Sequence, residues 1–323
     1  MNDFLNNLNA VRKRYNIFFV LLVLFAFCSV INPNFLSLDN LSNISRQLAV
    51  TTILAFGATL LIICGLLDLS AGSVLALSGV FSVSAYLATG SLLIAFIAGV
   101  LTGVACNVVN AVMVATFNAP PFIATLAMMA MARGVALRYT KGQNIYQIGD
   151  YTIFGQGFLF GIPIPIIFLV AIFILTWYIL RHTPFGRSLY AIGGNEEAAV
   201  ASGIQVIKTK YIAYIINGAL VGIAGILFMS RVNSGLPNGA IGFEFQALTA
   251  AIIGGTSFSG GIGTASGTLA GAFIVGFLDN IMNLTGVDSY LQQIIRGAII
   301  ALAVIYDIWA KKRRTVAKLG KIE

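Results

Sequence analysis

Long apolar stretches recur along the whole chain, and they constrain its fold more than any other feature. The first, YNIFFVLLVLFAFCSVI at residues 15–31, contains no charged residue. About 20 apolar residues in a helix are enough to cross the hydrocarbon core of a bilayer. We therefore expect an all-α polytopic membrane protein, a bundle of about ten transmembrane helices. The predicted spans are residues 15–31, 48–67, 72–89, 92–117, 122–138, 162–180, 211–229, 247–262, 265–283 and 291–309.

The second and third predicted spans are separated by very few residues. Only DLSA, residues 68–71, joins them. Irregular backbone at membrane depth is tolerated where it is buried in protein or lines a cavity. A broken or re-entrant helix is therefore the alternative to two complete spans at this point.

The scarcity of charge excludes a soluble globule. Charged residues make up 9% of the chain and hydrophobic residues 58%, whereas soluble domains average about 25% charged residues. We expect residues 1–323 to form a single transmembrane domain. No small-residue cleavage site follows the first span, so we expect that span to be retained in the mature protein.

Most of the 19 Lys and Arg residues fall on one side of the predicted spans. That side carries residues 12–14, the 181–210 loop and the C-terminal tail. The other side carries only Arg46, Arg138, Lys141 and Arg231. Because loops rich in Lys and Arg face the cytoplasm, both termini and the 181–210 loop are predicted to be cytoplasmic. These basic flanks produce the net charge of +8 and are suited to contact with anionic lipid. We therefore expect membrane lipid as a partner and no nucleic acid.

The 181–210 loop contains a short predicted helix in NEEAAVASG, residues 195–203. Asn195 is a favourable N-cap, and Glu196 and Glu197 suit the positive end of the helix dipole. Gly203 suits the end of the helix. A helix of about two turns is too short to be stable alone in water. It must therefore pack on its own bundle or on another protein.

Glycines spaced four residues apart predict close approach of helix backbones, because small residues let helices pack tightly in lipid. Three sets lie inside or at the edge of predicted spans. They are Gly99 and Gly103, then Gly218 and Gly222, then Gly263, Gly267 and Gly271.

The sequence has no pattern typical of an enzyme or a metal site. His182 is the only histidine, and Cys28, Cys64 and Cys106 lie in apolar runs without C-x-x-C spacing. Such thiols are expected to be free, with no disulfide framework or zinc site. No G-x-x-x-x-G-K-[ST] phosphate-binding motif occurs. We expect no catalytic residue, no metal and no cofactor in this chain.

Several segments resemble the permease subunits of bacterial ABC sugar importers, which include ribose, galactoside, arabinose and xylose permeases. The most specific motifs are DLSAGS at 68–73 and GGNEEAAVASGI at 193–204. Further similar segments, which extend the resemblance over nearly the whole chain, are residues 31–50, 118–137 and 251–287. The resemblance implies a permease homodimer in the bacterial inner membrane. It also implies a periplasmic sugar-binding protein that delivers a monosaccharide, and a cytoplasmic ATPase that binds ATP and Mg²⁺.

The same resemblance gives the short helix a partner, since the corresponding helix of the family fits a groove in the ATPase and transmits its movement. The implied ATPase-coupling residues are Asn195, Glu196, Glu197, Ala198, Ala199 and Gly203. A large charged residue in place of Ala199 or Gly203 is expected to uncouple transport from the ATPase without preventing membrane insertion.

A sugar crossing the membrane needs hydrogen-bonding partners at membrane depth. The predicted pathway residues are Asp68, Asn107, Asn110 and Asn217. Alternatively, Asp68 caps the start of the third span, and Asn107 and Asn110 form hydrogen bonds between helices.

Asp279 and Arg296 lie on adjacent predicted spans, where uncharged residues are frequent in the resembled family. Ionisable groups inside a membrane usually face a cavity or a partner. We therefore predict a structural ion pair between these two side chains.

Two other functions remain open from the residues. ABC permeases for nucleosides or branched-chain amino acids share a related fold, although DLSAGS and GGNEEAAVASGI favour sugars. A secondary transporter needs an ion or proton relay inside the bundle, and Asp68 alone makes a poor one. The motifs do not specify which sugar is carried.

Overall fold

The computed structural model describes residues 2–319. Met1 and residues 320–323, including Lys321 of the predicted basic tail, lie outside the described residues. The α-helices are α1 (Asn2–Ile31), α2 (Leu38–Ile63), α3 (Ala71–Thr89), α4 (Leu92–Ala111), α5 (Pro121–Thr140), α6 (Ile153–Gln156), α7 (Ile164–His182), α8 (Pro184–Gly194), α9 (Glu196–Ala201), α10 (Val206–Arg231), α11 (Phe243–Ile253), α12 (Ala265–Leu284) and α13 (Ser289–Leu319). Short helical turns are η1 (Pro33–Leu36), the π-helical η2 (Val112–Thr116) and η3 (Gly149–Thr152), and a hairpin pairs β1 (Phe158–Leu159) with β2 (Ile162–Pro163).

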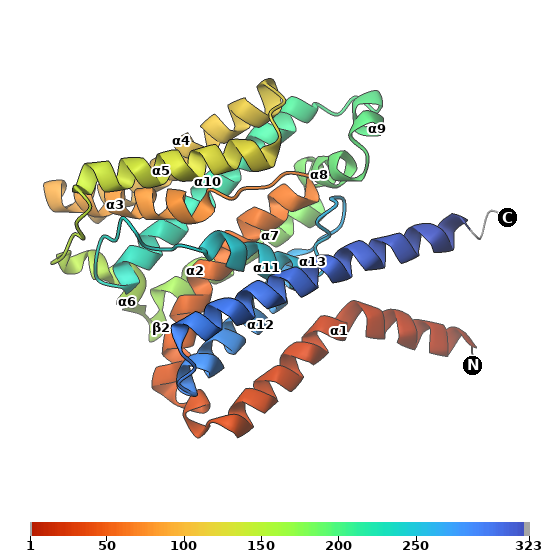
Figure 1. Ribbon diagram of the computed structural model, residues 1–323, viewed down its shortest axis with the longest axis horizontal. Helices are drawn as coiled ribbons and strands as arrows, with labels where there is room; N and C mark the ends of the chain where they lie inside the picture. Colours follow the sequence, from red (N-terminus) through yellow and green to blue (C-terminus); the bar gives the residue numbers. More distant parts are fainter. Residues whose placement is uncertain (1, 320–323) are drawn as a thin grey trace.

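The long helices form a bundle with two distinct ends (Figure 1). Helices α8 and α9 lie at one end, here called the α9 end. The β1–β2 hairpin lies at the other, here called the hairpin end. The first described turns of α1 and the last described turns of α13 lie toward the α9 end (Figure 1). The segments that the sequence places on one side of the membrane therefore lie toward one end of the bundle.

Among the described residues, seven helices are long and apolar enough to cross a membrane. They are α2, α3, α4 together with η2, α5, α7, α10 and α12. Shorter apolar segments occupy Ile17–Ile31 of α1 and the whole of α11. This confirms the all-α polytopic class, with between seven and ten membrane helices.

The helix boundaries differ from several predicted spans, and two of the differences have a clear structural cause. The second predicted span begins at Leu38 instead of residue 48, because Ser37 caps the helix by accepting a hydrogen bond from Asn40 N at 3.3 Å. The eighth was expected over 247–262, but α11 ends at Ile253. Residues 254–264 form turns, in which Gly255 has a φ of +86°. An apolar composition alone does not distinguish a helix from a glycine-rich turn.

The chain is not helical between α2 and α3, as the broken-helix alternative expects. Residues 64–70 leave the α9 end and return toward the middle of the bundle, where α3 begins (Figure 1). Gly65 makes the reversal with a φ of +78°, a conformation that glycine adopts without steric cost.

A second interruption precedes α11. Arg133 of α5 donates from Nη1 to Pro237 O at 2.6 Å and to Gly239 O at 2.9 Å. These bonds fix the segment that leads from α10 into α11. At the start of α3, Gly72 packs so closely that a Cβ there would meet the Glu244 carboxylate of α11. The beginnings of the two interrupted helices therefore meet inside the bundle.

The spaced glycines bring α4 and α10 into backbone contact, as predicted. A Cβ on Gly103 would lie 2.9 Å from Gly222 N, and a Cβ on Gly222 would lie 2.7 Å from Gly99 O. Because backbone atoms occupy these positions, a larger residue cannot be accommodated by a rotamer change. The α4–α10 pair is thus one of the tightest helix contacts of the bundle.

Loss of the α12 N-cap is expected to cause a moderate destabilisation. Thr264 Oγ1 accepts a hydrogen bond from Gly267 N at 3.0 Å. Thr264→Ala should lower the free energy of unfolding by about 1 kcal/mol, whereas Thr264→Ser keeps the acceptor. Unfolding of the purified protein in detergent by titration with dodecyl sulfate measures both values. Equal losses in the two variants would exclude capping as the role of this hydroxyl.

Candidate functional site

The short helix α9 forms in the 181–210 loop with the predicted caps. Asn195 Oδ1 accepts a hydrogen bond from Ala198 N at 2.9 Å, which satisfies a backbone N–H at the helix start. Gly203 follows the helix with a φ of +81°, a conformation that favours glycine. The helix of about two turns is confirmed, at six residues.

The two faces of α9 have different surroundings. Ala199 points into the bundle and is 3% exposed. Val200 points outward and is 59% exposed, and Ile207 at the start of α10 is equally exposed. Of the predicted coupling residues, Ala199 therefore packs on the bundle, whereas Asn195, Glu196, Glu197, Ala198 and Gly203 are exposed.

Sequence reasoning missed Val200 because an apolar residue in an Ala-rich helix looks like a packing residue. The exposure of Val200 can be recognised only when it is known which face of α9 packs on the bundle.

An ion pair joins α9 to α10. Lys210 Nζ donates to Glu196 Oε1 at 2.8 Å and to Oε2 at 3.0 Å. The Glu196 side chain is 53% exposed, so such a pair contributes at most about 1 kcal/mol to stability. Glu197 is exposed and has no ion pair within the described residues, so its charge is available to another molecule.

Helix α8 connects α9 to the membrane helices. A Cβ on Gly193 would collide with Ile63 O, at the end of α2, and would lie 2.7 Å from Gly261 N. Gly261 N itself donates to Ile63 O at 2.9 Å. Helix α8 therefore touches α2 and the 254–264 turn through backbone atoms.

A tyrosine adds a hydrogen bond to the same junction. Tyr190 of α8 donates its hydroxyl to Gly263 O at 2.8 Å. A phenol is protonated at neutral pH and can donate, and burial raises the pKa of Tyr190 further from neutrality. This bond and the contacts of Gly193 hold α8 against the membrane helices.

The four predicted pathway residues come together in one buried cluster. Asp68 Oδ1 accepts hydrogen bonds from Ser70 N at 2.8 Å and from the Ser70 hydroxyl. Asn217 Nδ2 donates to Asp68 Oδ2 at 2.7 Å and to Asn107 Oδ1 at 2.9 Å. Asn110 Nδ2 donates to Ser70 Oγ at 3.1 Å. We call Asp68, Ser70, Asn107, Asn110 and Asn217 the Asp68 cluster.

The Asp68 cluster links three helices from distant parts of the sequence. The N-cap of α3 is Ser70 and has no side-chain cap bond. Asp68 accepts from Ser70 N itself, ahead of the helix, so the capping alternative for Asp68 is wrong. Asn107 and Asn217 belong to α4 and α10, the pair held together by glycines. All four predicted residues are at most 5% exposed. Most of their polar atoms have hydrogen-bond partners in this conformation, and the buried Asn110 Oδ1 has none among the described residues.

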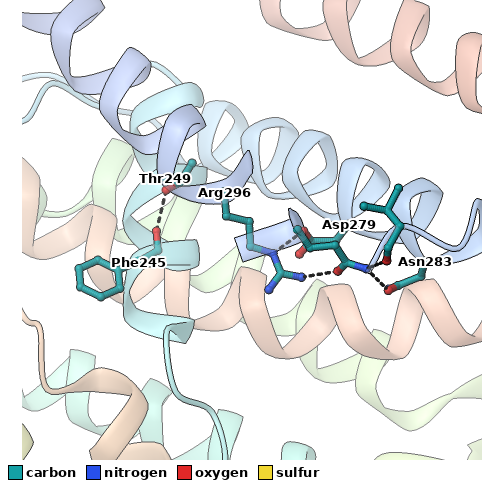
Figure 2. Close-up of polar contacts among 7 residues, drawn as sticks. Phe245, Thr249, Asp279, Asn283 and Arg296 are labelled. Atoms are coloured by element: carbon teal, nitrogen blue, oxygen red, sulfur yellow. Dashed lines mark hydrogen bonds and ion pairs between the residues drawn. The ribbon is translucent and has the colours of Figure 1, made fainter. Parts of the chain in front are cut away.

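Asp279 and Arg296 are in direct contact (Figure 2). Arg296 Nε lies 2.8 Å from Asp279 Oδ1. The pair continues into a polar chain, since Arg296 Nη2 donates to Gln292 Oε1 at 3.3 Å and Gln292 Nε2 donates to Asn283 Oδ1 at 2.9 Å. This chain connects α12 to α13 near the turn between them.

Metal-ligating side chains do not cluster in the part of the chain that the structure describes. No group of three or more His, Cys, Asp or Glu residues lies close enough there to hold a metal ion. Cys28 and Cys64 are buried free thiols, and Cys106 is partly buried and free.

Comparison with known proteins gives one family and a consistent group of relatives. Residues 40–304 match the family model described as "Branched-chain amino acid transport system / permease component". The ribose import permease RbsC of Escherichia coli K12 is 43% identical over 292 residues, which are 89% of this chain and 91% of the relative. RbsC of Bacillus subtilis 168 is 39% identical over 302 residues, 93% of this chain and 94% of the relative.

A second sugar occurs among the relatives. The L-arabinose transport system permease AraH of Escherichia coli K12 is 38% identical over 306 residues, 94% of this chain and 93% of the relative. No solved structure matches the chain.

Proposed function

Because the chain belongs to the family of branched-chain amino acid transport system permease components, we propose that it is the permease subunit of an ABC importer for a monosaccharide. The observation that carries this proposal is the group of ribose and arabinose permeases that align over about nine-tenths of the chain. The exposed α9, with its unpaired apolar Val200, supports a role in binding another subunit. In this assignment the chain is a transport subunit and catalyses no reaction itself.

The proposal includes an orientation and a set of partners. The α9 end faces the cytoplasm, where an ATPase binds ATP and Mg²⁺, and both termini of the chain lie on that side. The hairpin end faces the periplasm, where a sugar-binding protein delivers the cargo. Residues 1–323 form one transmembrane permease domain of a multi-pass bacterial inner-membrane protein, with residues 181–210 as its coupling loop. Two copies of this chain form the membrane part of the transporter.

Uptake by the reconstituted transporter tests the function directly. The permease, its ATPase and its binding protein are placed in liposomes that contain ATP. Radiolabelled D-ribose, L-arabinose, leucine and uridine are then offered separately. ATP-dependent accumulation of one of the sugars is the expected result. Accumulation of leucine or uridine alone would support the amino acid or nucleoside alternative, and accumulation without ATP would support a secondary transporter.

Binding of the ATPase at α9 should depend on Val200. Val200→Glu places a charge on an apolar surface that is 59% exposed, and charges are unfavourable at the centre of an interface. We expect the variant to insert and fold normally but to lose sugar uptake, with weaker co-purification of the ATPase. Phe160→Glu is the matched control, because Phe160 is an exposed apolar residue at the hairpin end. Equal ATPase recovery with both variants would contradict an interface at α9.

The Asp68 cluster is retained as a proposed element of the sugar pathway. Its amide and carboxylate groups suit sugar hydroxyls, and it lies inside the bundle. Contact with sugar there requires α3, α4 and α10 to separate, because the cluster is closed in this conformation.

A further inference from the structure

A cavity of about 380 Å³ lies between α11, α12 and α13, away from the Asp68 cluster. Small-molecule sites typically have volumes of about 300–1,000 Å³. The cavity is therefore of a suitable size for one small ligand. Its lining includes Phe245, Gln246 and Thr249 of α11, Asp279 of α12, and Gln293 and Arg296 of α13.

One wall of the cavity belongs to α12, one of the seven helices that are able to cross a membrane. Arg296 follows the start of α13 at Ser289 by two helical turns, which is a distance of about 10 Å along the helix. Figure 2 shows Arg296 reaching from α13 to Asp279 on α12, with Phe245 and Thr249 on the neighbouring α11. Ionisable side chains in membrane-spanning helices usually face a partner or a water-filled space. Here Arg296 and Asp279 do both, because they pair and also line the cavity.

The polar groups of the cavity have unused hydrogen-bonding capacity. Within the described residues, Arg296 bonds through Nε and Nη2, and its Nη1 has no partner. Asp279 accepts through Oδ1, and its Oδ2 has no partner there. Thr249 Oγ1 donates to Phe245 O at 2.7 Å and keeps its acceptor positions. The side-chain amides of Gln246 and Gln293 also line the cavity and make no hydrogen bond to the described residues.

These groups match the chemistry of a monosaccharide. A sugar ring carries several hydroxyls, each a donor and an acceptor, and the cavity offers a carboxylate oxygen, guanidinium N–H groups and two amides. Phe245, which is 46% exposed, adds an aromatic surface on which the C–H groups of a sugar can pack.

From this combination, and resting on the proposed function, we propose that the cavity is a monosaccharide subsite of the translocation pathway. Gln246, Asp279, Gln293 and Arg296 supply the hydrogen bonds to the sugar.

A sugar is expected to bind in the cavity before it reaches the Asp68 cluster. In the Asp68 cluster most of the polar atoms already have hydrogen-bond partners, and its predicted pathway residues are at most 5% exposed. In the cavity the polar atoms already have space beside them. A sugar therefore enters the cavity without breaking an existing hydrogen bond of Gln246 or Gln293.

Protection of an introduced cysteine tests this subsite. Gln293→Cys places a thiol in the cavity wall, and Gln246→Cys provides a second probe on α11. Ile294→Cys is the matched control, since Ile294 is 67% exposed on the same helix but does not line the cavity. All three are made with Cys106→Ala, because Cys28 and Cys64 are buried. Each permease is reconstituted with its ATPase and binding protein and treated with a small thiol reagent.

Labelling is compared in the presence of sugar-free and sugar-loaded binding protein, using D-ribose or L-arabinose according to which one the wild-type transporter accumulates. At about ten times the half-saturating concentration measured for each variant, sugar leaves about one-tenth of a simple site empty. Labelling at Gln293→Cys or Gln246→Cys should then fall about tenfold, in proportion to site occupancy. Labelling at Ile294→Cys should stay unchanged.

Three results would overturn the subsite. Sugar-independent labelling at both cavity positions, with normal wild-type uptake, would contradict the subsite and leave the proposed function intact. Thiols that react only after lipid is extracted would show that lipid fills the cavity. Accumulation of neither sugar by the wild-type transporter would contradict the proposed function itself, and the subsite with it.

Discussion

Gly193→Ala is expected to destabilise the junction below α9 and to reduce sugar uptake to near background. The added methyl group would collide with Ile63 O and come within 2.7 Å of Gly261 N. Both are backbone atoms, so relief requires a shift of α2, α8 or the 254–264 turn. Overpacking of this kind costs about 1–3 kcal/mol. Thermal unfolding in detergent and uptake in liposomes measure the two effects.

Gly194→Ala is the matched control for this prediction. Gly194 is the next residue of the same helix, and a Cβ there would meet no other atom within 4 Å. Replacement of a helical glycine by alanine should stabilise the protein slightly, by about 0.5–1 kcal/mol. If the two variants unfold at the same temperature and transport equally well, α8 does not pack through Gly193.

If α9 binds an ATPase as proposed, the contacts of Gly193 give its movement a route to the membrane helices. Helix α9 is tied to α10 by the Glu196–Lys210 pair. Helix α8 touches Ile63, immediately before the 64–70 segment that leads to Asp68. Tyr214 of α10 donates its hydroxyl to Leu67 O of that segment at 3.1 Å. A displacement of α8 and α9 by an ATPase would therefore act on both sides of the interruption between α2 and α3.

Features set by neighbouring residues could be predicted from the sequence. The caps of α9 depend on Asn195 and Gly203, which act within one helical turn. The apolar runs gave most of the membrane helices, because their length alone allows them to cross a bilayer. Asp279 and Arg296 were paired because they are opposite charges on adjacent spans, where few other partners exist.

Features set by distant contacts could not be predicted in the same way. The early end of α11 depends on packing between the 254–264 turn, α2 and α8, whereas its sequence is apolar enough for a longer helix. The meeting of Asp68, Asn107 and Asn217 depends on how three helices cross, which no local pattern specifies. The outward direction of Val200 likewise depends on where α9 sits on the bundle.

Asn217→Leu is expected to destabilise the protein strongly by removing two hydrogen bonds of the Asp68 cluster. It removes the amide that donates to Asp68 Oδ2 at 2.7 Å and to Asn107 Oδ1 at 2.9 Å. Each buried acceptor left without its donor costs about 1–3 kcal/mol. Because the side chains have similar size, the loss reports hydrogen bonding more than cavity formation. Dodecyl sulfate titration should show a large fall in unfolding free energy, whereas Asn144→Leu, at an exposed amide, should change it little.

Exchanging the amide of Asn217 with the carboxylate of Asp68 separates the contribution of their hydrogen bond from the other effects of replacing Asn217. Asn217→Asp alone puts a second carboxylate beside Asp68 and should be strongly destabilising, because two buried acceptors then face each other. Adding Asp68→Asn to the same chain restores one donor opposite one acceptor, so the double variant should be more stable than Asn217→Asp. The coupling energy from this double-mutant cycle should be between about 0.5 and 3 kcal/mol in favour of the exchange. Additive losses would mean that Asn217 acts through its shape, and that the cluster does not hold α3, α4 and α10 together by hydrogen bonds.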